Sequence, residues 1–421
     1  MHHPGVRAAL RPQDTEVPQS SSPQTSGTQS CSACERRRGR WLRGERAGNC
    51  VVRVLVATVV HDPRDARVYA REIAALVDAG HDVTYIAPFT SFGLTGLPGV
   101  DPVDIPAAKG RNRLSAFRAA RHELRRRAPD HDVVLLHSPE LILSARDLEH
   151  PCIVWDVHED TAAAVTLKGW LPRPIRRPVA DAVGWAERWA ERHWHLILAE
   201  DAYVDRFRSR HPVVPNSTPV PPDVPPSGND RAVYVGHVTR ARGGDEIVAV
   251  GRRLRGSVET HVIGHADDDM SGALRRAHDC GDVIWHGYLA NTEAMAIVQG
   301  ATVGLALLHD EPNYRHSRPT KIMEYWAQGI PVVSTPLPMA VEMIESSEGG
   351  LVVPFANADA AADAVLHLVR QRRLRQEMAD NGRRWVKENA DWNVDGPEFV
   401  SILRSWASGS TLDQHGATDA S

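Results

Sequence analysis

The stretch Ser317-Arg-Pro-Thr-Lys-Ile-Met-Glu-Tyr-Trp-Ala-Gln-Gly-Ile-Pro-Val-Val-Ser-Thr335 decides how the fold of this chain is interpreted. Ser317 or Thr320 can cap a helix, and Pro319 suits its first turn because the missing N–H would be unpaired there. Gly329 ends the helix, and the proline two residues later prevents it from continuing into the apolar residues that follow. The stretch therefore predicts a helix of about three turns that leads into a buried strand.

The first turn of this predicted helix carries a cation and a carboxylate on one face. Its unpaired N–H groups favour an anion, and Lys321 adds a full positive charge. Glu324, three residues later, can accept hydrogen bonds from a diol. Such a pair suits a nucleotide sugar, although a solvated Lys–Glu pair is the common alternative. The scarcity of lysine favours a phosphate contact, because the chain has lysine only at Lys109, Lys168, Lys321 and Lys387.

The composition is that of a globular protein with more than one domain. The 421 residues are 42% hydrophobic and 24% charged, with a net charge of −4, which argues against a general nucleic-acid binder. No apolar run approaches the roughly 20 residues of a membrane-spanning helix. The N-terminus has no apolar signal core, and the five scattered cysteines fit reduced thiols, so we expect a cytoplasmic protein.

Alternating apolar runs and helical patterns divide the chain. Strands are expected at 52–60, 81–87, 133–136, 152–155, 196–199, 232–235, 258–263, 283–285, 302–307, 331–334 and 350–353. The predicted divisions are a disordered tail (1–50), a first domain (51–215), a proline-rich linker (216–230), a second domain (231–390), a helix that can return to the first domain (391–408) and a polar tail (409–421). The pattern predicts two Rossmann-like, doubly wound parallel sheets facing a cleft, with ligands at the carboxyl ends of the strands.

With these motifs in place, residues 52–406 resemble the GT-B glycosyltransferases, in particular the retaining group 1 (family 4) enzymes. The stretch quoted above carries the resemblance most strongly, together with Glu342 and Gly349-Gly-Leu-Val-Val-Pro354. The motifs Asp62–Tyr69, His137–Glu140, Asp156–Asp160 and Val214–Asn216 are similar to a subgroup of that family. By resemblance, Lys321 binds the donor diphosphate, Glu324 binds the ribose hydroxyls and Thr320 lies at the same helix start.

A glycine-rich turn after the first strand of the second domain is the other expected diphosphate contact. It runs Tyr234-Val-Gly-His-Val-Thr-Arg-Ala-Arg-Gly-Gly244 and brings Gly236 and two arginines to one loop. The family usually has Arg directly after the first glycine and Lys before the later one, whereas this chain has His237 and Arg242. We expect Arg242, and next Arg240, to contact the diphosphate. A surface loop with two arginines is the alternative.

Polar residues after the strands of the first domain are the candidates for the reacting centre. His158 follows a strand end and, by resemblance, faces the donor sugar; a histidine that only bonds its acidic neighbours is the alternative. His61, Asp65 and Arg67 stand where the family has a glycine-rich loop near donor and acceptor. His137 and Glu140 are candidates for acceptor contacts, with a structural role as the equal alternative.

Three further features bear on substrates. Gly264 and Gly287 resemble positions that flank the nucleotide base, with a plain strand-end turn as the alternative. Many family members have a carboxylate eight positions before Glu324, where this chain has His316. The sequence therefore does not predict which sugar the donor carries. The basic and aromatic segment 173–194 suits peripheral contact with a membrane, although a packed helix is the better interpretation.

These features predict a retaining transferase that moves a sugar from a nucleotide-diphosphate donor to a hydroxyl acceptor. We expect Lys321, Arg242 and His158 to act on the reaction, with positive side chains in place of a metal and no other cofactor. The chain has no Asp-x-Asp pair where a metal would be needed. A nucleotide-sugar epimerase of the same fold and a non-catalytic nucleotide-sugar-binding subunit are the rival hypotheses.

Overall fold

The computed structural model describes residues 51–158, 173–312, 314–315 and 318–409. The predicted disorder of residues 1–50, the tail 410–421, the cap Ser317 and the substituted position His316 lie outside these ranges.

The first sheet contains six parallel strands in the order β3-β2-β1-β4-β5-β6. They are β1 (Arg53–Ala57), β2 (Asp82–Ala87), β3 (Asp101–Asp104), β4 (Val133–Leu136), β5 (Ile153–Val157) and β6 (His195–Leu198). β1, β4 and β5 lie at the centre and are almost wholly apolar, because helices cover both of their faces.

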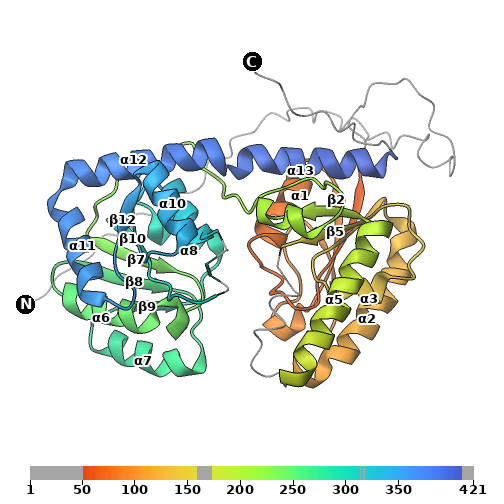
Figure 1. Ribbon diagram of the computed structural model, residues 1–421, viewed down its shortest axis with the longest axis horizontal. Coiled ribbons are helices and arrows are strands. Elements are labelled where there is room, and N and C mark those ends of the chain that lie inside the picture. Colours follow the sequence, from red (N-terminus) through yellow and green to blue (C-terminus); the bar gives the residue numbers. More distant parts are fainter. Residues whose placement is uncertain (1–50, 159–172, 313, 316–317, 410–421) are drawn as a thin grey trace, which may run out of the picture. The chain divides into compact units, whose positions relative to one another are not determined.

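Two groups of helices cover this sheet. On one face, Leu124 of α2 (Arg113–Arg127), Leu141 of α3 (Leu141–Ala145) and Ala190 of α5 (Arg173–His193) share a core, and Figure 1 shows these helices side by side. On the other face, the π-helix η1 (Val68–Ile73) and α1 (Ala74–Asp78) pack with α13 (Trp392–Ala407). Short 3-10 turns occupy Thr90–Phe92, Gly110–Asn112, Ala128–Asp130 and Asp201–Arg206.

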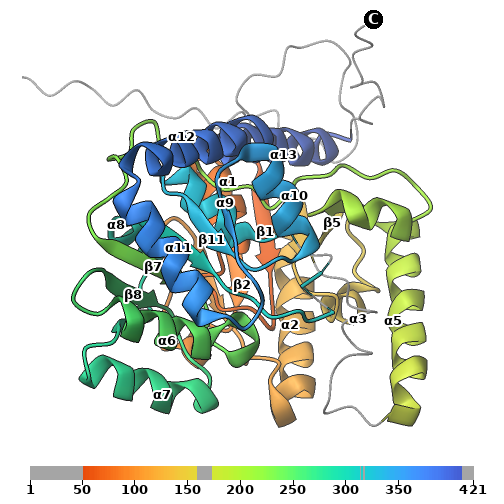
Figure 2. The ribbon, with the colours of Figure 1, turned by 60° about the vertical axis from the view of Figure 1, so that its left-hand side comes forward.

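The second sheet also has six parallel strands, in the order β12-β11-β10-β7-β8-β9. They are β7 (Arg231–Val235), β8 (Glu259–Ile263), β9 (Ile284–Gly287), β10 (Val303–Ala306), β11 (Val332–Ser334) and β12 (Gly350–Val352). The helices α6 (Gly244–Leu254), α7 (Asp268–Asp279) and α11 (Ala358–Arg370) share one core and lie on the same side of the sheet (Figure 2). A second core contains α8 (Asn291–Val298), α9 (Thr320–Ala327), α10 (Pro338–Ser347) and part of α12 (Arg372–Asn389). The predicted pair of doubly wound parallel sheets is confirmed.

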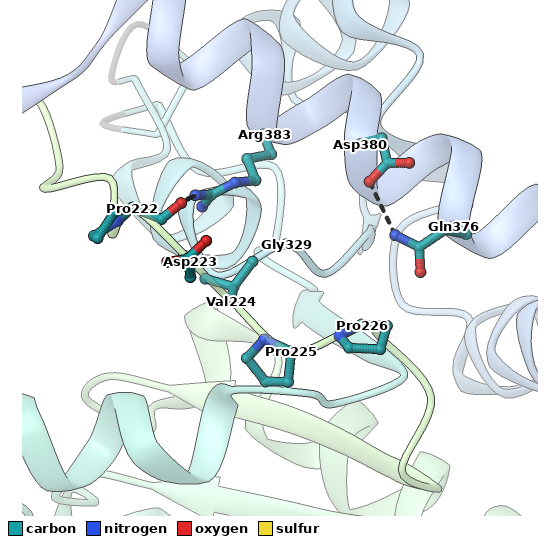
Figure 3. Close-up of a pocket in the computed structure, with 9 residues that line it drawn as sticks. All are labelled: Pro222, Asp223, Val224, Pro225, Pro226, Gly329, Gln376, Asp380 and Arg383. Atoms are coloured by element: carbon teal, nitrogen blue, oxygen red, sulfur yellow. Dashed lines mark hydrogen bonds between the residues drawn. The ribbon is translucent and has the colours of Figure 1, made fainter.

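The proline-rich segment 216–230 forms no helix or strand and is held by α12. Arg383 donates hydrogen bonds to the carbonyl oxygens of Pro222 (3.1 Å), Pro221 and Ala327. A cavity of about 300 Å³ lies between this segment and α12, and Figure 3 shows Arg383 directed at the segment. None of the predicted catalytic residues lines this cavity.

The decisive helix is shorter than predicted and is capped differently. α9 has eight residues, about two turns, and the residue before it is Pro319. Thr320 is the first helical residue, so the prediction that its side chain caps the helix is wrong. β3 was missed because only Val103 among its four residues is buried, which leaves no apolar alternation to detect.

α5 packs on the first sheet. This agrees with the interpretation of segment 173–194 as a packed helix. Ala190 is buried in the core and Trp189 packs against it, although 55% of Trp185 is exposed. Within the described ranges, no helix is both long enough and apolar enough to cross a membrane.

Tyr325 fixes α9 to the second sheet and generates a stability prediction. Its hydroxyl accepts a hydrogen bond from the backbone N–H of Val235 (2.9 Å), and its ring lies over Gly304 of β10. A Cβ atom at Gly304 would stand 2.2 Å from the ring, so Gly304→Ala should lower the free energy of unfolding by about 1–3 kcal/mol. Urea unfolding measures this change.

Gly272 of α7 provides the matched control. Its nearest neighbour to an added Cβ is the guanidinium of Arg276 at 3.5 Å, an ordinary contact. Gly272→Ala should therefore leave stability unchanged or raise it by up to about 1 kcal/mol. Equal stability of the two variants would contradict the packing described for α9.

Candidate functional site

The N-terminus of α9 presents Lys321 to the loop that follows β7. The Lys321 ammonium nitrogen lies 4.0 Å from the ring centre of Tyr234. A Cβ atom at Gly236, which has a φ of 130°, would stand 3.1 Å from that nitrogen. Glycine is therefore needed here both for the backbone conformation and for the close approach of the lysine.

Lys321 has no acidic partner at salt-bridge distance among the residues that the structure describes. Burial of its ammonium group, together with the positive charge of Arg242, lowers the pKa of Lys321 to about 7, while Glu324 acts in the opposite direction. A half-buried amine with an aromatic ring as its neighbour is electrostatically unsatisfied. An anion at this position would restore its charge.

The two arginines of the glycine-rich loop differ in their surroundings. They lie in the short turn Arg240–Arg242, which Thr239 caps by accepting a hydrogen bond from the backbone N–H of Arg242. Arg240 is exposed and paired with Asp245 at 2.8 Å. Arg242 is half-buried, is near enough to lower the pKa of Lys321, and forms no ion pair with a described residue. The order of preference given to them from sequence has a structural basis.

Glu324 lies one turn after Lys321 and is bonded to the other sheet's helical layer. Arg71 of η1 donates to Oε1 of Glu324 at 3.2 Å and to the side-chain oxygen of Asn216 at 2.9 Å. This ion pair occupies one oxygen of the carboxylate predicted to bind the ribose. The other oxygen, Oε2, forms no hydrogen bond or ion pair within the described part of the chain and can accept a further hydrogen bond.

A buried ionic cluster stands at the carboxyl ends of β1, β4 and β5. Arg67 donates to both oxygens of Asp156, at 2.8 and 2.6 Å, and to the carbonyl oxygen of Val214 at 3.2 Å. Its Nε also lies 3.0 Å from Oε1 of Glu72. Arg67, Glu72 and Asp156 are all less than 5% exposed, so this cluster is in the interior and not on a binding surface.

His137, His158 and His61 extend the cluster outward. Oδ2 of Asp156 lies 3.2 Å from Nδ1 of His137 and 3.0 Å from Nδ1 of His158. The Nε2 atoms of His158 and His61 are 3.2 Å apart, and Nδ1 of His61 lies 2.7 Å from the hydroxyl of Thr58. Burial would lower the pKa of His158, but its bond to Asp156 raises it above the ordinary value.

The residues expected on the acceptor side therefore fall into two groups, those connected to the cluster around Asp156 and one that is not. His61, Asp65, Arg67, His137 and His158 come together, whereas no described hydrogen bond joins Glu140 to them; it precedes α3. His137 is fully buried between Asp156 and Glu72, and Arg67 is enclosed, so neither can contact an acceptor directly. For these two the structure replaces the predicted contact with an internal role.

His137, Asp156 and His158 also have ligand atoms close enough together to hold a metal ion. Both oxygens of Asp156, however, already accept hydrogen bonds from Arg67. A cation placed there would meet the positive guanidinium and would have to displace it. The cluster is better suited to holding protons than to holding a metal.

Gly264 and Gly287 end β8 and β9, where the base was expected. The N–H of Gly264 donates to the carbonyl of Gly287 at 2.6 Å, and a Cβ at Gly264 would clash with the carbonyl of Gly236 at 2.1 Å. Gly264 is thus required for packing of two loops, whatever binds beside them. Next to them the ring of Tyr288 stacks on His265 and carries the guanidinium of Arg64 at 4.1 Å.

The contacts that Asp156, Glu72 and Arg71 make with the predicted site residues were not expected from the sequence. Asp156 was quoted within a motif, and a carboxylate in an otherwise apolar buried strand was the available signal. Arg71 and Glu72 come four and five residues after Arg67, a spacing that indicates a shared helix but not their distant partners.

Comparison with known proteins finds a family match within the second domain and finds solved structures with the same fold. Residues 229–371 match the family profile described as "Glycosyl transferases group 1", while no curated protein matches the chain by sequence. Sucrose-phosphate synthase from Thermosynechococcus elongatus aligns with a TM-score of 0.64 at 16% identity, over 85% of this chain and 100% of that one. HepE from Anabaena, solved in complex with UDP-glucose, gives a TM-score of 0.61 at 13% identity, over 84% and 100%. WaaG, a glycosyltransferase involved in lipopolysaccharide biosynthesis, gives 0.58 at 16% identity, over 83% and 99%. The predicted GT-B fold is confirmed.

The lowered pKa of Lys321 predicts that the residue destabilises the unliganded protein. Its pKa is 10.5 when unperturbed and about 7 in the fold, so the folded chain releases a proton between these pH values. The cost of the lysine is therefore greatest below pH 7 and disappears as the pH approaches 10.5. Lys321→Met should raise the thermal unfolding midpoint at pH 6, with a gain that shrinks toward pH 10.

Calorimetry of both proteins at the two pH values isolates this difference, since other groups titrate alike in each. A variant less stable than the parent at pH 6 would show that Lys321 has a favourable partner in the unliganded protein.

Proposed function

Because residues 229–371 belong to the group 1 glycosyltransferases and the chain has the GT-B fold, we propose that it transfers a sugar from a nucleotide-diphosphate donor to an acceptor hydroxyl, with retention at the anomeric carbon. One observation carries the proposal for donor binding. Lys321 and Arg242, two neighbouring cations without an acidic partner among the described residues, meet at the N-terminus of α9. A diphosphate supplies the negative charge that this arrangement lacks.

The donor is proposed to lie along the loops of the second sheet. Lys321, Arg242 and the backbone N–H groups of α9, beginning at Thr320, hold the diphosphate, while Gly236 leaves room for it. Oε2 of Glu324 accepts from a ribose hydroxyl while Oε1 keeps its bond to Arg71. Gly264 and Gly287 flank the base. HepE is solved with UDP-glucose, which makes UDP-sugars the first donors to test.

Catalysis in this proposal is electrostatic. Departure of the diphosphate leaves negative charge on its oxygens, and the preorganised cations stabilise that charge at the transition state. In this proposal His158 faces the reacting sugar, as the family resemblance implies, and His61 faces the acceptor; their Nε2 atoms are 3.2 Å apart. We propose that transfer needs no metal, because positive side chains stand at the diphosphate and Arg67 occupies the carboxylate of the candidate metal cluster.

The proposed compartment is the cytoplasm. Cys152 and Cys280 are free thiols, which fits a reducing environment. The acceptor, its attachment to a lipid and peripheral contact with a membrane remain predictions from the sequence.

The first test is a thermal-shift screen of the full chain against nucleotide sugars, followed by product analysis in the presence of EDTA. A donor that binds only the folded protein raises its unfolding midpoint by an amount that grows with the logarithm of the ratio of its concentration to its dissociation constant. With that donor and an acceptor panel, Lys321→Ala should lower turnover by about 100-fold or more. Lys387→Ala, a change on the exposed side of α12, should leave turnover intact.

Three outcomes would overturn the proposal. Full turnover by Lys321→Ala removes the residue from the mechanism. Conversion of the nucleotide sugar without any acceptor indicates an epimerase. Tight donor binding with no turnover across the acceptors indicates a non-catalytic binding subunit.

The loop arginines give a matched pair of substitutions. Arg242→Ala should raise the dissociation constant for the donor by about tenfold or more, the effect expected when a charge-assisted hydrogen bond is lost. Arg240→Ala should change it little, because that side chain is exposed and paired with Asp245. Isothermal titration measures both. A larger loss for Arg240→Ala would place the diphosphate on the outer side of the loop.

A further inference from the structure

Asp156 is a buried carboxylate on which four hydrogen bonds from three side chains converge. Oδ1 accepts from Arg67 at 2.6 Å, and Oδ2 lies within 3.2 Å of Nε of Arg67 and of Nδ1 of both His137 and His158. A carboxylate in this position only accepts, so each histidine must carry its proton on Nδ1. Burial alone would raise the pKa of Asp156, but Arg67 and the two histidines hold it well below the ordinary value.

Glu72 touches the same guanidinium, but its pKa is displaced in the opposite direction from that of Asp156. It is fully buried; its Oε1 lies 3.0 Å from Nε of Arg67 and its Oε2 lies 3.4 Å from Nε2 of His137. Burial, and then the negative charge of Asp156, raises the pKa of Glu72 well above its ordinary value. Burial lowers the pKa of His137, whose Nε2 is then a bare acceptor. Nε2 of His137 and both oxygens of Glu72 lack hydrogen-bond partners, so a protonated Glu72 has two acceptors to choose from: this nitrogen, at 3.4 Å, and Asp156, a bond to which also raises the pKa of Glu72.

The proton on Nδ1 determines what His158 presents on its other side. Its Nε2 lies 3.2 Å from Nε2 of His61, and two ring nitrogens at that distance share one proton. The chain continues from Nδ1 of His61 to the hydroxyl of Thr58 and from there to Ser138 at 3.2 Å. Among the residues that the structure describes, the charged and titratable groups facing His158 are Asp156, Asp65, Arg67, His61 and His137.

We propose that Asp156, clamped by Arg67, is the positioning residue of this site: it fixes the Nδ1–H form of His158 and thereby directs Nε2 of His158 at His61, while Glu72 contacts Arg67 and His137 and does not orient His158. The proposal rests on the proposed function in one respect, that His158 faces the reacting sugar. It requires that two neighbouring carboxylates, both in contact with Arg67, respond oppositely to the same isosteric change.

The test compares Asp156→Asn with Glu72→Gln in the full chain. Asparagine cannot accept every bond that Asp156 accepts, so His158 loses its anionic partner and its pKa falls. We expect turnover to fall at least about tenfold, as for other losses of a residue that orients a reactive group, with the KM for the donor nearly unchanged. The limb of the pH profile that His158 sets should move to lower pH, whichever form of His158 is active. Glu72→Gln should keep both turnover and the profile, because the amide donates to His137 as the neutral acid does.

A spectroscopic measurement keeps the proposal testable if Asp156→Asn fails to fold or if no donor is turned over. Nitrogen-15 correlation spectra of histidine-labelled protein report the protonated nitrogen and the pKa of each ring, and the His158→Gln spectrum identifies the signals of His158. In the parent protein and in Glu72→Gln, His158 should carry a proton on Nδ1 and titrate above the value of a histidine in the urea-unfolded chain.

The outcomes separate this proposal from the proposed function. Absence of turnover by the parent protein refutes the function and leaves the spectra to decide the role of Asp156. A His158 that is bare at Nδ1, or that titrates below the unfolded value, overturns the positioning role, as does Asp156→Asn with a normal profile. Glu72→Gln that loses activity while folded would show that Glu72 is ionised.

Discussion

The bidentate bond between Arg67 and Asp156 is the contact on which the first domain's functional edge depends. One guanidinium joins the loop after β1, the strand β5, the helix η1 through Glu72 and the backbone at Val214, where the chain leaves the domain. Both ions are enclosed, and leaving either one without the other would cost roughly 3–5 kcal/mol. The pair therefore orients the side chains bonded to it, His137 and His158, and contributes little net stability.

The second sheet shows the complementary arrangement, in which charge is left without a partner. Arg242 lies close enough to Lys321 to disfavour protonation of the lysine, and the lysine faces an aromatic ring in place of an acid. Such an arrangement is costly in an unliganded protein and useful only if an anion arrives. The two domains therefore differ in how their charges are paired. In the first domain the charged groups bond to one another and to histidines, whereas in the second domain the positive charge of Lys321 has no acidic partner among the described residues.

The sequence was sufficient for the architecture and for the proximity of Lys321, Gly236 and Arg242, and insufficient for the interior of the first domain. β4 was predicted with its observed bounds, since a short continuous apolar run has a single simple interpretation. Lys321, Gly236 and Arg242 were found because their motifs are local. The bonds of Arg67 to Asp156 and of Arg71 to Glu324 span 89 and 253 residues, and no local pattern specifies such partners. The length of α9 and its cap were wrong because Thr320 and Pro319 are compatible with either position at a helix start.

The hold of Arg383 on the proline-rich segment has a mechanical consequence. The same guanidinium bonds to two carbonyls of that segment and to the carbonyl of Ala327, the last residue of α9. Lys321 lies near the N-terminal end of the same helix, six residues before Ala327. A movement of segment 216–230 would therefore also move α9 and the Lys321 ammonium group. The prolines of this segment thus help to determine where that positive charge lies.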